Sequence, residues 1–281
     1  MTEAPDDMGT DAGGKVTATM SELEQAILAL ESVAIGFSGG VDSSLVVAVS
    51  VGVLGRENVL AVTSRSETLP AHELAAACDL AAELGVRHEV IQTRELDCDD
   101  FRANPPDRCY HCKSELWNRA GDLARRTGLR HLADGTNADD AGDTRPGTRA
   151  GDEAGVRHPL ADAGAGKDMV RRLARKMGLP NWDKPAQACL SSRFPYGTEI
   201  TREGLRRVEE AERYLRELGL EGFRVRDHGD LARIEVGEDS IASLAGNSRR
   251  RRITERFREL GYVYVALDLQ GFRSGSMNEV L

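Results

Sequence analysis

A short segment near the start of the chain combines glycines, hydroxyls and one acid in an order that suits an anion. It follows the apolar stretch 33–37 directly and opens a predicted helix. Glycines let the backbone approach a ligand, a helix N-terminus offers unpaired N–H groups, and hydroxyls add donors. A Walker loop would need a lysine before its last Ser or Thr, and none is present. We therefore predict a different phosphate-binding loop, formed by Ser38, Gly39, Gly40, Val41, Asp42, Ser43 and Ser44.

A second polar segment follows a later predicted strand, 130–134. Ligands of parallel α/β sheets bind beyond the carboxyl ends of the strands, so both polar segments should lie at one edge of the sheet. An Asx-rich turn without a ligand is the alternative interpretation. Because the first loop is present, we favour nucleotide contacts from Gly135, Thr136, Asn137 and Asp139.

Three of the five cysteines are candidates for metal or sulfur chemistry. Cys109 and Cys112 form a C-x-x-C pair just before a predicted helix, where the positive end of the helix dipole favours thiolates. Cys189, in the segment Q-A-C-L-S-S-R, is the third candidate. Three cysteines would leave one iron of a [4Fe–4S] cluster without a protein ligand, and that iron could carry a labile sulfur. Three unrelated packed thiols are the competing interpretation.

Alternating strands and helices must position these residues. The alternation predicts an α/β fold with a parallel sheet and helices on both faces. Ser21 and Glu24 form a capping box, which predicts that order begins there after a disordered tail. Residues 135–162 are predicted to form a long loop. The predicted strands are 33–37, 59–63, 86–92 and 130–134, and the predicted helices are 43–54, 72–84, 113–127 and 167–177.

The pattern changes after Gly197, which predicts a second, smaller α+β domain. We expect helices at 205–218 and 253–260, a hairpin of 223–227 with 231–236, and a strand at 263–269. The predicted organisation is a tail at 1–20, a nucleotide-binding domain at 21–197 and the α+β domain at 198–281.

Composition limits the classes of function. A chain of 281 residues, with 40% hydrophobic and 30% charged residues, is typical of a two-domain globular protein. Its net charge of -9 argues against wholesale nucleic-acid binding. No apolar run approaches the roughly 20 residues of a membrane span. An acidic start without an apolar segment, together with an odd number of cysteines, predicts a cytoplasmic protein with reduced thiols.

Two resemblances of different specificity follow from these motifs. S-G-G-x-D-S is similar to the pyrophosphatase loop of the ATP-dependent PP-loop superfamily, which includes GMP synthetase, NAD synthetase and tRNA thiolases. Over residues 23–269 the chain resembles the LarE-type sulfur transferases, which build the nickel-pincer nucleotide of lactate racemase. That narrower resemblance rests on the loop 38–44, N-P at 104–105, R-C-Y-H-C-K at 108–113, the segment 134–140, R-P-G at 145–147, K-P at 184–185 and A-C-L-S-S-R-F-P-Y-G at 188–197.

The LarE-type resemblance implies a substrate and a reaction. ATP would adenylate a carboxylate of pyridinium-3,5-biscarboxylic acid mononucleotide and release pyrophosphate, and sulfur would then displace AMP to leave a thiocarboxylate. Asp42 would help to hold the Mg²⁺ that neutralises pyrophosphate. Family members of this type form trimer-based homo-oligomers. The resemblance also implies substrate or phosphate contacts from Arg193, Arg224 and Arg226, whose guanidinium groups suit carboxylates and phosphates.

The family is known in two forms that differ in the source of sulfur. In one, the cysteine matching Cys189 gives up its own sulfur; in the other, three cysteines hold a [4Fe–4S] cluster that relays sulfur from an external donor. Sacrificial members lack the C-x-x-C pair, so Cys109 and Cys112 favour the cluster form here. Three other functions stay open: a tRNA thiolase, a non-catalytic iron–sulfur or metal carrier, and an ATP-dependent amidase resembling NAD synthetase.

Overall fold

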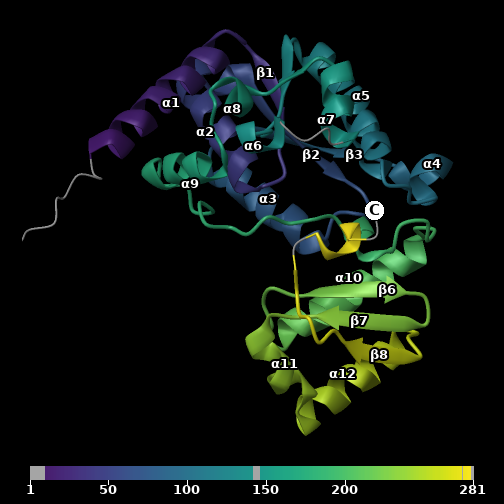
Figure 1. Cartoon of the computed structure of the whole chain (residues 1–281). Coiled ribbons are helices and arrows are strands. Elements are labelled where there is room, and N and C mark those ends of the chain that lie inside the picture. The colour runs from purple at the N-terminus through teal and green to yellow at the C-terminus, as the bar shows by residue number, and fades with distance from the viewer. Residues whose placement is uncertain (1–9, 142–145, 274, 280–281) are drawn as a thin grey trace, which may run out of the picture. The chain divides into compact units, whose positions relative to one another are not determined.

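The computed structural model describes residues 10–141, 146–273 and 275–279, and it contains two compact units (Figure 1). The first unit comprises Met1–Arg65, Ala71–Thr93 and Tyr110–Gln187. The second unit comprises Ser66–Pro70, Arg94–Cys109 and Ala188–Leu281. The second unit thus begins before the predicted boundary at Thr198 and takes in two earlier segments of the chain.

A parallel five-stranded sheet forms the centre of the first unit, as the alternating pattern predicts. The strand order is β3-β2-β1-β4-β5, so β1 lies between β2 and β4 at the centre. Val33, Ala34 and Ile35 of β1 are all buried, because helices cover both faces of the sheet. The strands are β1 (Val33–Gly36), β2 (Val59–Arg65), β3 (Arg87–Gln92), β4 (His131–Ala133) and β5 (Val156–Arg157).

The two faces of this sheet carry separate hydrophobic cores. Val33 and Ile35 belong to the larger core, together with buried residues of α1 (Thr10–Leu28), α2 (Val41–Leu54), α3 (Ala71–Glu83), α8 (Pro159–Asp162) and α9 (Lys167–Lys176). Ala34 points to the opposite face, where it packs with Trp117 of α5 (Arg108–Thr127). This split follows from the alternation of side chains along a strand.

Two predictions for the first unit were wrong. The capping box does not begin the ordered chain, because α1 starts at Thr10 and Ser21 lies inside it. Val16 and Met20 pack against the larger core, which extends the helix toward the N-terminus; residues 1–9 lie outside the described residues. The predicted long loop 135–162 also contains secondary structure: α6 (Ala138–Ala141), α7 (Pro146–Glu153), β5 and α8.

The second unit has a three-stranded sheet of order β6-β7-β8. β6 (Arg224–His228) and β7 (Leu231–Glu235) form the predicted antiparallel hairpin, and β8 (Tyr264–Leu267) pairs parallel to β7. Val225, Ile234 and Phe257 are buried in its core. Its helices and single turns are η2 (Glu95–Asp97), α4 (Asp99–Arg102), η3 (Leu190–Arg193), α10 (Arg202–Glu217), α11 (Glu238–Ala245), α12 (Asn247–Glu259) and η4 (Ser276–Asn278); η1 (Arg56–Asn58) belongs to the first unit.

Asn104 joins two of the separate segments that build the second unit. It is fully buried, and its Nδ2 donates to the carbonyl oxygen of Pro195 over 2.7 Å. The carbonyl oxygen of Asn104 accepts from the backbone N–H of Gly197 over 2.9 Å. Residues 94–109 are therefore held against the chain that follows Cys189, although about 90 residues separate them in sequence.

Gly36→Ala tests the packing between β1 and α5. A Cβ at Gly36 would lie 2.6 Å from Cη2 of Trp117. The indole ring is buried and has little room to move, so we expect a loss of about 1–3 kcal/mol in the free energy of unfolding. Gly52→Ala is the control, because no atom lies within 4 Å of its added Cβ, and alanine in this helix should stabilise by about 0.5–1 kcal/mol. Urea denaturation measures both, and equal stability of the two variants would contradict this packing.

Candidate functional site

The phosphate-binding loop lies where β1 passes into α2. Gly40 is the N-cap of α2, so the first N–H groups of the helix face the loop. Gly39 has φ +68°, and a Cβ there would lie 3.1 Å from Cα of Ala77. A side chain at Gly39 would meet both backbone strain and a close contact. Hydroxyls tighten the turn, because Ser44 Oγ donates to the carbonyl oxygen of Gly40 over 2.7 Å.

The second polar segment packs directly on this loop. β4 is the neighbour of β1, and the strand order changes direction between them, which is where such sheets bind ligands. A Cβ at Gly135 would lie 2.6 Å from the backbone nitrogen of Ser43. Asn137 is 1% exposed, and its Nδ2 donates to Oδ1 of Asp42 over 2.9 Å. The two segments therefore share one edge of the sheet, as the sequence predicts.

The acids of this edge differ in what they contact. Asp42 lies in the first turn of α2, and its carboxylate accepts from Asn137. A carboxylate beside hydroxyls is a donor set that suits Mg²⁺, so the residues present fit the predicted ion. Asp139 instead accepts from the backbone nitrogen of Lys167 over 2.7 Å, at the N-terminus of α9. That contact holds α9 against the loop; nucleotide contact by Asp139 stays a prediction.

The segment 181–184, of which the sequence marked only the last residue, supports the phosphate-binding loop. Asn181 Nδ2 donates to the carbonyl oxygen of Gly39 over 3.1 Å and to Oγ of Ser44 over 3.0 Å. Lys184 lies 2.7 Å from Oε2 of Glu73. Hydrogen bonds from His72 and Lys184 lower the pKa of Glu73 to about 2, although burial alone would raise it. Only the K-P pair at 184–185 gave a sequence signal for this support.

In the second unit, the buried side chain of Arg193 holds the backbone around Cys189. Arg193 is 2% exposed and forms a two-pronged pair with Glu212, over 2.9 and 3.0 Å. Its Nη1 donates to the carbonyl oxygens of Ala188 and Cys189 over 2.7 and 3.0 Å. Ser192 Oγ donates to the same oxygen of Cys189 over 2.9 Å. The backbone at Cys189 is thus fixed, whereas the residue itself is exposed.

Two further arginines lie on β6, on the same face of the strand. Arg226 is 5% exposed, pairs with Glu235 over 2.7 Å and donates to the carbonyl oxygen of Ser192 over 2.9 Å. Its Nε is buried and has no hydrogen-bond partner among the described residues. Burial and the positive charges of Arg193 and Arg226 lower the pKa of Arg224 to about 10. Guanidinium groups gathered in this way suit an anionic ligand; contact of these arginines with substrate stays a prediction.

All five cysteines lie in the described part of the chain, and none forms a disulfide bond. Cys109 and Cys112 are one turn apart in the first turns of α5, so their thiols share a face of that helix. Cys109 and Cys189 belong to the second unit and Cys112 to the first, so no arrangement of the three thiols is assigned. The [4Fe–4S] cluster stays a prediction.

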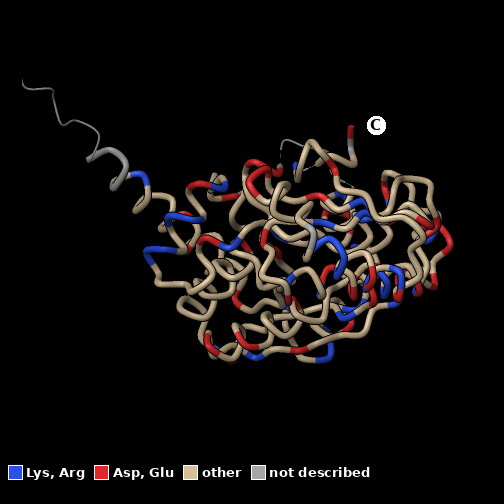
Figure 2. Tube along the Cα trace, turned by 90° about the horizontal axis from the view of Figure 1, so that it is seen from below, with Lys and Arg blue, Asp and Glu red and all other residues tan. Residues whose placement is uncertain are grey.

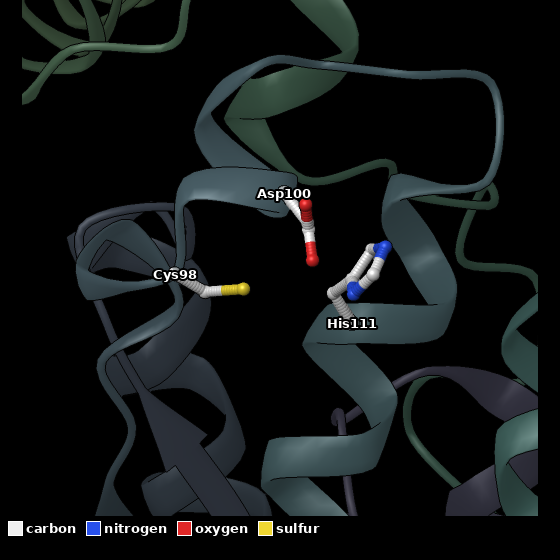
Figure 3. A group of neighbouring side chains, drawn as sticks. All are labelled: Cys98, Asp100 and His111. Carbon is white, nitrogen blue, oxygen red and sulfur yellow. The ribbon is translucent and has the colours of Figure 1, made fainter.

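Cys98 is half-buried. Figure 3 shows its side chain with those of Asp100 and His111. Cys98 and Asp100 belong to the second unit, whereas His111 lies in the part of α5 that belongs to the first unit. We assign no metal site to these residues.

Apart from the arginine run 249–252, basic and acidic residues are mixed along the chain. Figure 2 shows Lys and Arg interspersed with Asp and Glu along the Cα trace. Nucleic-acid binding relies on many phosphate contacts from clustered basic residues, so this distribution does not favour it. Among the described residues, no helix is long and apolar enough to cross a membrane.

Glu212→Gln tests the buried pair that holds the Cys189 backbone. Removing the charge leaves the Arg193 guanidinium buried and uncompensated, so the free energy of unfolding should fall by about 3 kcal/mol. Glu217→Gln is the control, because its pair with Arg213 is half-exposed and contributes only about 0–1 kcal/mol. Urea denaturation of both variants checks this difference. A Glu212 variant as stable as the Glu217 variant would contradict the assigned role.

Comparison with known proteins places the chain in a family. Residues 17–104 match the NAD synthase family. An uncharacterized protein of Synechocystis sp. is 45% identical over 93% of this chain and 97% of its own length. The pyridinium-3,5-bisthiocarboxylic acid mononucleotide synthase of Lactiplantibacillus plantarum is 43% identical over 92% of this chain and 93% of its own. The NH(3)-dependent NAD(+) synthetase of Chlorobaculum tepidum is 33% identical over 57% of this chain and 58% of its own. The chain therefore belongs to the LarE-type family of PP-loop enzymes, to which the L. plantarum synthase also belongs.

Proposed function

We propose that this chain is an ATP-dependent sulfur transferase that converts the carboxylates of pyridinium-3,5-biscarboxylic acid mononucleotide into thiocarboxylates. The observation that carries the proposal is the joining of two nucleotide loops, through Asn137 and Asp42, in a chain that matches the L. plantarum synthase along nearly its whole length. The NAD synthetase relatives match only about half of the chain, which favours sulfur transfer over amidation.

The first step of the proposed reaction is adenylation. A carboxylate oxygen of the substrate attacks the α-phosphorus of ATP, the bond to the bridging oxygen breaks, and pyrophosphate leaves. Backbone N–H groups at the start of α2 and the hydroxyls of Ser38 and Ser43 would hold the leaving pyrophosphate. Mg²⁺ held by Asp42 would neutralise part of its charge. Activation is needed because a carboxylate oxygen is a poor leaving group, whereas AMP is a good one.

The second step is sulfur transfer. Sulfur at the oxidation level of sulfide attacks the carbonyl carbon of the acyl adenylate, the carbon–oxygen bond to AMP breaks, and AMP leaves with that oxygen, so that a thiocarboxylate remains. Cys189 fits the site of sulfur delivery, because it is exposed while Arg193 and Ser192 fix its carbonyl oxygen. Arg224 and Arg226 fit the phosphate or carboxylate of the substrate, because both guanidinium groups lie on one face of β6 and the buried Nε of Arg226 has no hydrogen-bond partner among the described residues.

For the source of sulfur, we propose the cluster form. Cys109, Cys112 and Cys189 would hold a [4Fe–4S] cluster, and the C-x-x-C pair on one helix face supports this. When bound, the cluster would accept sulfur from an external donor and pass it on. We further propose that the enzyme acts in the cytoplasm as a trimer-based homo-oligomer and without nucleic acid. A tRNA thiolase is not favoured, because basic residues are mixed with acidic ones along the trace (Figure 2).

Cys189→Ala separates adenylation from sulfur transfer. We expect thiocarboxylate formation to fall below detection, because the proposed cluster loses one of its three protein ligands, while substrate-dependent pyrophosphate release persists within about threefold of wild type. Cys78→Ala on α3 is the control and should retain both activities. Pyrophosphate release and mass spectrometry of the nucleotide product measure the two steps. Normal thiocarboxylate formation by Cys189→Ala would contradict the assignment.

Iron and acid-labile sulfide content test the cluster. Protein purified without oxygen should contain about four of each per chain, and Cys109→Ser and Cys112→Ser should each lower both. Cys98→Ser should leave both unchanged. Wild-type protein without iron would contradict the cluster form and favour loss of sulfur from Cys189 itself.

A further inference from the structure

His158 contacts two carboxylates at once, one through each ring nitrogen. Its Nδ1 lies 2.7 Å from Oδ1 of Asp134, and its Nε2 lies 3.0 Å from Oδ1 of Asp152. Ionised carboxylates can only accept hydrogen bonds, so both ring nitrogens must carry a proton. The arrangement therefore requires His158 to be an imidazolium ion. No motif marks His158 in the sequence, because it stands apart from the other histidines and without metal-ligand spacing.

The charged groups around His158 come from three elements. Asp134 directly follows β4, Asp152 lies on α7, and Lys113 of α5 adds a positive charge near Asp134. The hydrogen bond to Asp134, with the further contact to Asp152, raises the pKa of His158 to about 9 against the effect of burial. Burial would raise the pKa of Asp134, but the hydrogen bond from His158 lowers it. The ion pair is therefore intact at neutral pH.

Asp134 connects this ion pair to the nucleotide loops. Its Oδ1 accepts from the backbone nitrogen of Thr136 over 2.9 Å, and its Oδ2 accepts from Oγ1 of Thr136 over 2.9 Å. These bonds set the turn that brings Asn137 to Asp42 of the phosphate-binding loop. A series of hydrogen bonds thus runs from His158 through Asp134 and the turn to Asp42.

We propose that His158 is a positioning residue of the nucleotide site. Its bridge between Asp134 and Asp152 fixes the turn 134–137 against the phosphate-binding loop, and this contact with Asp134 sets the affinity for ATP. The inference rests on the proposed function only in taking ATP as the nucleotide. His158 contacts Asp134, and Asn137 contacts the phosphate-binding loop. The effect of His158 on the loop therefore passes through Asp134 and Asn137.

Two substitutions of His158 separate its two contacts. An asparagine side chain places its amide nitrogen near the position of Nδ1, so His158→Asn keeps a donor for Asp134. A glutamine amide reaches the position of Nε2, so His158→Gln keeps the contact with Asp152 and loses the one with Asp134. We expect His158→Gln to weaken ATP binding about tenfold, because a hydrogen bond to a charged group is lost, and His158→Asn to weaken it by about threefold or less.

The dependence of ATP affinity on pH supplies a second readout. Below the ordinary pKa of histidine the imidazolium is fully formed, so wild-type affinity should be constant there and should fall as pH rises through about 9. His158→Asn cannot titrate, and its affinity should lack this fall. Asp152→Asn removes one carboxylate at an exposed position, so the fall should begin at a lower pH than in wild type.

Calorimetric titration of the full-length protein with Mg-ATP measures these affinities, and thermal unfolding without nucleotide confirms that each variant folds. His131→Gln, at the other end of β4, is the matched control and should bind ATP as wild type does. Wild-type affinity in both His158 variants, with an unchanged pH profile, would overturn the inference while leaving the proposed function intact. Absence of ATP binding by the wild-type chain would overturn the proposed function and this inference with it.

Discussion

The hydrogen bond between Asn137 and Asp42 is the contact on which the proposed nucleotide site depends. It joins a loop after β4 to a loop after β1, two segments almost 100 residues apart in sequence. Parallel pairing of the two strands brings the loops to one edge, and Gly135 lets the backbones approach. Since Asn137 is buried, an unpaired amide there would be costly, so the contact also favours the paired arrangement of both loops.

In the second unit, hydrogen bonds hold the backbone at Cys189 in place while the residue itself is exposed. Arg193 is buried with Glu212 as its counter-ion, and its remaining donors hold the carbonyl oxygens on either side of the Cys189 peptide. Buried ion pairs add little net stability, because both charges lose their hydration. Their use here is better explained by geometry: the guanidinium provides several directed hydrogen bonds from a single rigid group.

Much of the fold could be predicted because its signals are local. An apolar segment followed by glycines and hydroxyls predicted β1 and the phosphate-binding loop. Two strand-like segments on either side of Gly229 predicted the β6–β7 hairpin. β5 was missed because Val156 and Arg157 are too few to form a pattern. The true start of α1 was missed because packing of Val16 and Met20, not local propensity, extends the helix.

The site was predicted less completely, for a related reason. Residue types at fixed spacing indicated Asp42, Asn137 and Cys189 as candidates, but contacts between distant segments leave no such spacing. Asn181, which holds the carbonyl oxygen of Gly39, and His158, which holds Asp134, each stand alone in the sequence. The ion pair of Arg193 with Glu212 likewise could not be predicted, because its two residues lie on separate helical segments, η3 and α10.

Transfer of labelled oxygen from the substrate to AMP would reveal carboxylate adenylation. The substrate nucleotide would carry oxygen-18 in its carboxylates and be incubated with ATP, Mg²⁺ and a sulfur donor, and the AMP formed would be analysed by mass spectrometry. With adenylation, each AMP carries one labelled oxygen, because the carboxylate oxygen that attacks phosphorus leaves with AMP when sulfur enters. Unlabelled AMP, or ADP and phosphate in place of AMP and pyrophosphate, would contradict adenylation.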